Sequence, residues 1–329
     1  MPKLDPDKFV FHNLNPYIRI GTASDRYAGW IGQIYTEGKY KTTSRSNKVG
    51  GKSFKEEVLP VESVREYFQH FSVLEIDYTF YRPLLDADLK PTTNYHVLET
   101  YKKFLGRDDR LILKVPQAVF AHRIRRGGAF IENPDYLNAE KFTRQFYEPA
   151  NDILGDLIVG FVFEQEYQPK KDRQPPKQYT ESFDKFLASI PKDKRYHIEA
   201  RTEYYHINLY FEVLEKHGVG HVLSHWTWLP PLWKQYLKSG KRFYNSGRQC
   251  IIRLMTPLRM KYDEAYGKAF PFDKMVKGMI NPQMVSDTVE ISKGASKEGV
   301  TANVIVNNRA GGNAPLIARE IAKQYLEMT

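Results

Sequence analysis

Ionisable side chains recur at alternating positions near the ends of short apolar segments, and these residues carry the chemistry of the chain. Glu75 and Asp77 alternate within SVLEIDYTF, and Glu199 and Arg201 alternate within RYHIEART. Alternating residues of a strand point to the same face, so each pair would act on one side of a sheet. Similar segment ends carry Thr79, Tyr81, Lys114, Glu164, Gln165, Arg253, Asn307 and Asn308.

These residues indicate a catalytic or binding site, because charges inside strands are costly unless they are paired. Glu75 or Glu199 would act as the general acid or base, with a pKa set by burial and by neighbouring charges. Lys114, Arg201 and Arg253 would hold an anionic substrate or the charge that develops during reaction. The same residues also fit a second interpretation, in which they form a structural network of ion pairs that fills the interior.

The elements that must position these side chains alternate regularly along the chain. Short apolar or β-branched runs predict strands at 17–24, 72–80, 110–116, 157–165, 195–202, 219–226, 249–256 and 301–308. Between them, helical periodicity predicts helices near 61–70, 92–105, 138–153, 178–190, 206–217, 230–239, 282–293 and 313–327. Eight βα units predict a (β/α)₈ TIM barrel, with an open doubly wound sheet as the alternative. We expect residues 1–329 to form one such domain.

Long βα loops account for the length beyond a typical barrel. They lie near 25–60, 117–137, 166–177 and 257–281, and they carry an excess of basic residues close to the whole formal charge of +10. All four would lie on the face where barrel active sites occur, so an anionic partner is expected. Polar loops without a ligand remain the simpler interpretation of the same pattern.

The segment NNRAGGNAP offers a second anion signal, because it follows the last predicted strand and begins the last helix. Asn307, Asn308 and Gly312 would place backbone N–H groups of a helix terminus near a phosphate. A glycine-rich turn without a ligand explains the segment equally well.

Other chemistries have weaker signals. The chain has no HExxH, GxSxG, P-loop or GxGxxG motif, and we predict no cofactor. A divalent metal held by His122, His197 or His225 with glutamates stays an unsupported alternative. A sugar-binding barrel would use Trp226, Trp228 and Trp233, residues that also fit a core.

Cellular placement follows from the absence of targeting signals in the sequence. The first residues are charged and contain prolines, and the longest apolar run, residues 157–163, is too short to cross a membrane. The one cysteine, Cys250, precedes an apolar pair and is expected to be a buried thiol. We expect a cytoplasmic protein with no membrane segment. The sequence does not predict its oligomeric state.

Four segments, YFQHFSVLEIDYTFYRP, LKVPQAVFAHR, HIEAR and VIVNNRAGGNAP, resemble the YecE-like family, domain of unknown function 72. The resemblance runs from about residue 18 to the carboxyl terminus and implies a TIM barrel, but it implies no agreed activity. The matching positions are Glu75, Thr79, Phe80, Tyr81, Lys114, Pro116, His122, Arg123, Glu199, Arg201, Asn307, Asn308, Gly312, Ala314 and Pro315. The chain departs from the family pattern at Asp77, within GTASDRYAGW, and at Met255-Thr256.

Together these observations predict an enzyme of the hydrolase or isomerase type that acts on a phosphorylated or other anionic substrate. The predicted site combines Glu75 and Glu199 with a binding set that contains Asp77, Thr79, Tyr81, Lys114, His122, Arg201, Arg253, Asn307, Asn308 and Gly312. The main alternative is a nucleic-acid-binding protein without catalysis. It would use the basic loops, with Tyr27, Trp30, Tyr35 and Tyr40 stacking on bases.

Overall fold

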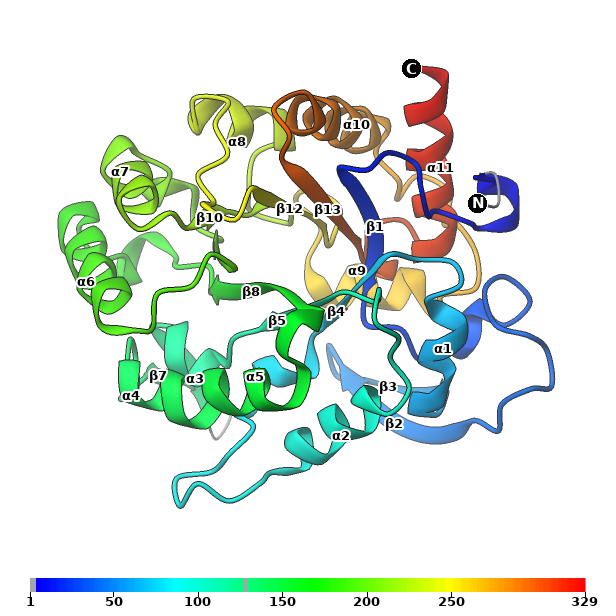
Figure 1. The fold of residues 1–329 in the computed structure, drawn as a ribbon, viewed down its shortest axis with the longest axis horizontal. Helices are drawn as coiled ribbons and strands as arrows, with labels where there is room; N and C mark the ends of the chain where they lie inside the picture. Colours follow the sequence, from blue (N-terminus) through cyan, green and yellow to red (C-terminus); the bar gives the residue numbers. More distant parts are fainter. Residues whose placement is uncertain (1–3, 127–128, 329) are drawn as a thin grey trace.

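Parallel strands form a ring at the centre of the computed structural model, which describes residues 4–126 and 129–328 (Figure 1). The ring contains β1 (Ile18–Ala23), β4 (Val73–Ile76), β5 (Leu111–Lys114), β8 (Ile158–Gln165), β9 (Tyr196–Ala200), β10 (Gly220–His221), β11 (Leu223–His225), β12 (Gln249–Leu254) and β13 (Thr301–Val306). Hydrogen-bonded neighbours in the ring are parallel, and the last strand, β13, pairs with the first, β1. The predicted TIM barrel is confirmed, and each of the eight predicted strands is present.

The sixth strand closes the ring in two parts. The first part, β10, pairs with β9, whereas β11 pairs with β12. Val222 lies between the two parts, and its backbone N–H donates to the carbonyl of Ile198 at 2.8 Å. One interrupted strand therefore joins both of its neighbours.

Helices surround the ring, as Figure 1 shows for α6, α7, α8, α10 and α11. The helices are α1 (Val64–Tyr67), α2 (Thr93–Lys102), α3 (Gln117–Phe120), α4 (Ala139–Phe142), α5 (Glu148–Leu154), α6 (Pro176–Ser189), α7 (Asn208–His217), α8 (Leu232–Lys238), α9 (Tyr262–Ala269), α10 (Pro282–Lys297) and α11 (Ala314–Glu327). The helix predicted at 138–153 is interrupted by a π-turn at Thr143–Tyr147. No helix within 4–126 and 129–328 is both long enough and apolar enough to cross a bilayer.

Two of the long loops contain antiparallel hairpins that the sequence pattern did not predict. Strands β2 (Thr43–Val49) and β3 (Lys52–Val58) pair after β1, and β6 (Arg123–Arg126) pairs with β7 (Ala129–Glu132) after β5. Their side chains are mostly exposed or half-buried, so the period-two signal of a strand packed on a core is weak here.

The inside of the barrel is layered along its axis. Val73, Ile112, Val162 and Ile251 belong to one buried apolar cluster within the ring. Two residues further along the same four strands stand Glu75, Lys114, Glu164 and Arg253, also buried. Because the side-chain period of a strand is two, both sets face inward. An apolar layer therefore lies beneath a charged one.

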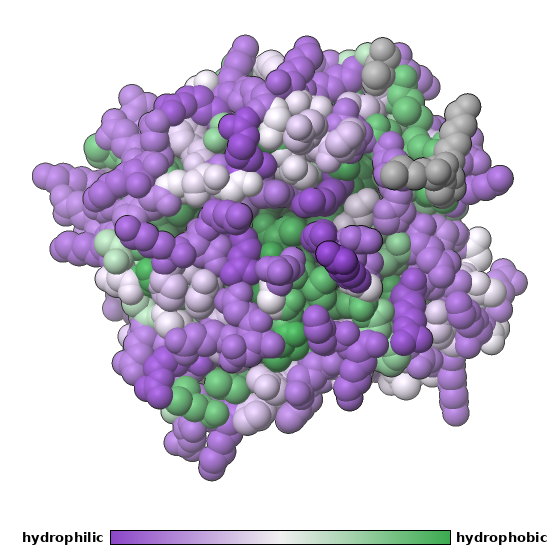
Figure 2. All heavy atoms as spheres, viewed as in Figure 1, coloured by the Kyte–Doolittle hydropathy of each residue, from purple (hydrophilic) through white to green (hydrophobic). Residues whose placement is uncertain are grey.

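On the outside, hydrophilic side chains cover most of the face in Figure 2, with hydrophobic ones reaching the surface near its middle.

Candidate active site

A pocket of about 940 Å³ opens at the carboxyl ends of the barrel strands. Each strand of the ring, with β10 and β11 taken as one interrupted strand, contributes a residue near its carboxyl end to the pocket lining. These residues are Ser24, Glu75, Lys114, Glu164, Arg201, Trp226, Arg253 and Asn307. This is the face on which TIM-barrel enzymes carry their active sites.

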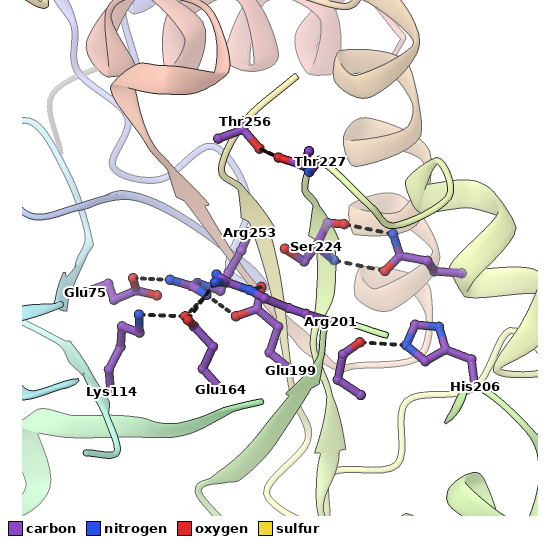
Figure 3. A network of polar contacts seen from close by, with 12 residues as sticks. Glu75, Lys114, Glu164, Glu199, Arg201, His206, Ser224, Thr227, Arg253 and Thr256 are labelled. Atoms are coloured by element: carbon purple, nitrogen blue, oxygen red, sulfur yellow. Dashed lines mark hydrogen bonds and ion pairs between the residues drawn. The ribbon is translucent and has the colours of Figure 1, made fainter. Parts of the chain in front are cut away.

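Arg253 is at the centre of a group of buried charges (Figure 3). Its guanidinium donates to Glu75 at 2.7 Å and to Glu164 at 3.1 Å, and it also donates to Glu199. Only 2% of the Arg253 side chain is exposed, so water does not screen these pairs. Four strands, β4, β8, β9 and β12, are thereby tied together at their carboxyl ends.

Glu164 connects Arg253 to two further cations. Lys114 Nζ lies 2.6 Å from one carboxylate oxygen of Glu164, and Arg201 lies 2.6 Å from the other. Arg201 Nε also donates to Glu199 at 3.2 Å. Three carboxylates therefore face three cations. We call these six residues the charged floor: Glu75, Lys114, Glu164, Glu199, Arg201 and Arg253.

Opposite pKa shifts distinguish two carboxyl groups of the charged floor. Burial raises the pKa of Glu75, and Arg253 and Lys114 only partly oppose the rise. Burial acts on Glu164 in the same direction, but Arg201, Lys114 and Arg253 outweigh it and hold its pKa well below the usual range. Glu75 also has one buried oxygen, Oε2, without a hydrogen-bond partner. Glu75 is thus the floor carboxyl most suited to carry a transferable proton.

Aromatic rings and a hydroxyl hold the floor cations in place. Lys114 Nζ lies 3.9 Å from the ring centre of Phe80, and the Arg201 guanidinium lies 4.9 Å from the ring of Trp226. The Thr79 hydroxyl donates to the backbone carbonyl of Lys114 at 2.7 Å. Thr79 therefore fixes the end of β5.

One wall of the pocket comes from the β2–β3 hairpin and α9. Glu56 accepts from Arg45 at 2.6 Å and from Asn47 at 2.8 Å, and it also accepts from the hydroxyl of Tyr266 in α9. Glu56 is buried and Arg45 and Tyr266 line the pocket. The hairpin is therefore fixed against the barrel by a second set of polar contacts.

Three charged residues of the pocket lining lack an ion pair within the described part of the chain: Arg26, Asp77 and Arg309. Arg26 Nε donates to the backbone carbonyl of Leu59. The Arg309 guanidinium lies 4.5 Å from the ring of Tyr262, and its buried Nε has no hydrogen-bond partner. Asp77 follows β4 and is half-buried. These charges, unlike the floor, are available to a ligand.

Comparison with known proteins places this architecture in a family. The sequence model of the family described as "Protein of unknown function DUF72" matches residues 19–328. The chain belongs to this family. It is similar to a DUF72 family protein from Enterococcus faecalis, at 16% identity and TM-score 0.58 over 94% of this chain and 95% of that one. A DUF72 family protein from Thermotoga maritima gives 15% identity and TM-score 0.56 over 94% and 99%. No curated protein matches the chain.

This DUF72 chain brings most of the predicted site residues into one pocket. The lining contains Glu75, Asp77, Tyr81, Lys114, Arg201, Arg253 and Asn307. Glu199 is fully buried, and its two oxygens pair with Arg253 and Arg201, so it positions those cations from below. Lys114, Arg201 and Arg253, which the sequence predicted to hold an anion, each pair with carboxylates in this structure.

The predicted phosphate loop of the DUF72 chain is occupied by internal contacts. Asn308 accepts from Trp30 at 3.0 Å and from the backbone N–H of Ala314 at 2.8 Å. The cap residue Asn313 accepts from the N–H of Leu316 at 2.9 Å. A Cβ on Gly312 would lie 2.3 Å from a backbone oxygen of the 274–276 segment, so this glycine allows close packing. Asn308 and Gly312 therefore do not reach the pocket.

His122 also lies away from the pocket lining. Its ring packs edge-on against Tyr136, with centroids 5.1 Å apart, and its backbone N–H donates to Glu166 at 3.0 Å. Within the described residues, no three His, Cys, Asp or Glu side chains are placed to hold a metal ion. Nδ1 of His197 and Nδ1 of His225 instead donate to the backbone carbonyls of Arg195 and Thr256, each at 2.9 Å.

Each of the three departures from the family pattern contributes a residue to the pocket lining, and Asp77 is one of them. Ser24 lines the pocket with a left-handed backbone, at φ +68°, and Met255 lines it after β12. Thr256 does not: its hydroxyl accepts from the N–H of Thr227 at 3.1 Å. The departures from the family sequence pattern therefore lie largely within the pocket of this chain.

Three residues of the pocket lining were not selected as site residues from the sequence: Arg26, Glu164 and Arg309. Glu164 stood among the polar strand ends but was not selected, although it joins three cations. Its position at the end of an eight-residue apolar strand was the available signal. Arg26 and Arg309 lie in loops, where basic residues are common, so no sequence signal distinguished them.

Proposed function

We propose that this DUF72 protein is an enzyme that uses acid–base catalysis on an acidic small molecule bound in the pocket. The observation that supports it most is Glu75, a fully buried carboxyl with a raised pKa and an unpartnered oxygen at the floor of a large pocket. A purely structural ion-pair network would have no need of an open pocket above it.

Glu75 would act as the general acid and Asp77 as the general base. Asp77 follows Glu75 by two residues, lines the same pocket and has no ion pair in the described chain. A buried carboxyl group with a raised pKa and a second carboxyl group in the same pocket suit hydrolysis and isomerisation alike. Arg309, whose guanidinium has no carboxylate partner there, would bind the acidic group of the substrate.

A non-catalytic role in binding nucleic acid has less support. Of the four aromatic residues predicted to stack on bases, Trp30 is fully buried and Tyr35 is 2% exposed, so neither can contact a ligand without rearrangement. Loop cations are also partly neutralised, since Arg45 pairs with Glu56 and Arg123 pairs with Asp172 at 2.8 Å.

Replacement of Glu75 by glutamine tests the proposal. Sugar phosphates and uronates would first be screened for turnover by mass spectrometry with the wild-type protein. For an accepted substrate, Glu75→Gln should lower kcat by at least about a hundredfold, the usual contribution of a general acid, with little change in binding. Glu215→Gln, on the exposed surface, is the matched control. Full turnover by Glu75→Gln would contradict the proposal, as would failure of the wild type to convert any compound.

A further inference from the structure

A row of aromatic side chains leads outward from the pocket. Trp226 lines the pocket, and the ring of Tyr167 lies 6.3 Å from it. Tyr167 also stacks on Trp228, with ring centroids 5.6 Å apart and planes at 30°. The outermost member, Trp228, is 44% exposed. We call Trp226, Tyr167 and Trp228 the aromatic row.

The inner end of the aromatic row is anchored to the charged floor. The Arg201 guanidinium lies against the ring of Trp226, and Arg201 itself is held by Glu164 and Glu199. Trp233 does not belong to the row. Its ring packs on Tyr236, with centroids 5.6 Å apart. The row thus begins at Trp226 in the pocket lining and ends at the exposed Trp228.

The polar groups beside the row favour a ligand rich in hydroxyls. The unpartnered oxygen of Glu75 and the carboxyl group of Asp77 can form hydrogen bonds with hydroxyl groups. Flat rings with an apolar face bind well to an exposed indole. A sugar ring combines such a face with hydroxyl donors, whereas Arg309 provides one position for an acidic group.

We propose that the aromatic row is a sugar-binding subsite and that the substrate is an acidic saccharide of at least two rings. One ring would lie over the charged floor and the next would stack on Trp228. This inference rests on the proposed function, because it extends the same pocket. The inference adds to the proposed function a class of substrate, acidic saccharides, and a preference for substrates of at least two rings.

Binding of paired short and long ligands tests the subsite. The probes are galacturonate with trigalacturonate, and glucose 6-phosphate with trehalose 6-phosphate, measured by titration calorimetry. Wild-type protein should bind the longer member of at least one pair more tightly. Trp228→Ala and Tyr167→Ala should each weaken that longer ligand about tenfold, the equivalent of one stacked ring, and leave the single-ring ligand unchanged.

Tyr17→Ala is the matched control, since Tyr17 is 42% exposed and precedes β1 at the opposite end of the barrel. It should bind every probe as the wild type does. Adenosine monophosphate reports on a base instead of a sugar. The subsite is refuted if the wild type binds none of the four saccharides, if adenosine monophosphate alone depends on Trp228, or if Trp228→Ala keeps full affinity. In the last case, single-ring binding through Arg309 would leave the proposed function intact.

Discussion

Two groups of buried polar side chains in this barrel avoid the cost of desolvation in opposite ways. The charged floor places its carboxyl groups against cations. Around the sixth strand, the buried histidines are His197, His206, His221 and His225. Burial lowers the pKa of His197, His206 and His225 to about 4 and holds the pKa of His221 well below its ordinary value, so these rings are neutral near pH 7.

This difference distinguishes the polar side chains that we propose to take part in catalysis from those that stabilise the fold. The histidines bond to fixed partners: His225 to the carbonyl of Thr256 at 2.9 Å, and His206 to that of Ala200 at 2.8 Å. None of the four lines the pocket. The floor retains charge where a ligand can approach. A barrel strand is equally able to bury a neutral polar residue, so charge kept at the pocket indicates chemistry.

Removal of Arg253 should have the largest effect. Arg253→Met leaves three carboxylates, Glu75, Glu164 and Glu199, without their shared cation, and we expect a loss of about 3–5 kcal/mol in the free energy of unfolding. Urea denaturation measures it. The control is Arg242→Met, which breaks a pair with Glu215 in which both side chains are more than half exposed, and should cost less than about 1 kcal/mol. Equal losses of unfolding free energy in the two variants would show that the ion pairs of the charged floor stabilise the protein no more than an exposed ion pair does.

The histidines predict acid sensitivity of a definite sign. Their folded pKa lies below the unfolded value, so the unfolded chain binds protons first as the pH falls. The stability they contribute is complete above about pH 6.5 and is lost between about pH 6.5 and pH 4. Each of these histidines should contribute about 1–2 kcal/mol of that loss between pH 7 and pH 5.

His206→Gln isolates one contribution. Glutamine can still donate to the carbonyl of Ala200 but does not titrate, so the fall in unfolding free energy between pH 7 and pH 5 should shrink by that amount. The exposed Leu209, replaced in the same way, should leave the pH dependence unchanged. If the unfolding free energy of His206→Gln depends on pH as that of the wild type does, His206 takes up its proton as readily in the folded protein as in the unfolded chain. The contrast with the charged floor would then be wrong.

The sequence predicted the fold and the centre of the site because both follow from local periodicity. Alternation of βα units fixed the barrel, and alternation within strands placed Glu75, Lys114 and Arg253 on its inner face. It did not predict which charges are paired, because pairing depends on contacts between distant strands, such as that of Arg253 with Glu75 across 178 residues. Loop residues carry no periodic signal, so the close packing of Gly312 against the 274–276 segment could not be predicted.

Replacement of Arg309 should give the smallest change in stability and a clear change in binding. Its guanidinium has an aromatic neighbour, Tyr262, but no carboxylate within the described chain, so Arg309→Met should alter the unfolding free energy by about 0.5–1 kcal/mol at most. Affinity for glucose 6-phosphate should fall about tenfold, since charge-assisted hydrogen bonds contribute about 1.5–3 kcal/mol and water replaces part of them.

Arg107→Met, at an exposed position after α2, should bind glucose 6-phosphate as the wild type does. Unchanged binding in Arg309→Met would return the role of anion holder to Lys114, Arg201 or Arg253. The floor would then have to open one of its ion pairs for each ligand. In that event the paired charges would form the binding site themselves, and affinity for the phosphate should rise when Glu164→Gln frees Lys114 and Arg201. If Arg309→Met weakens binding and Glu164→Gln does not strengthen it, the floor and the unpaired charges have separate roles.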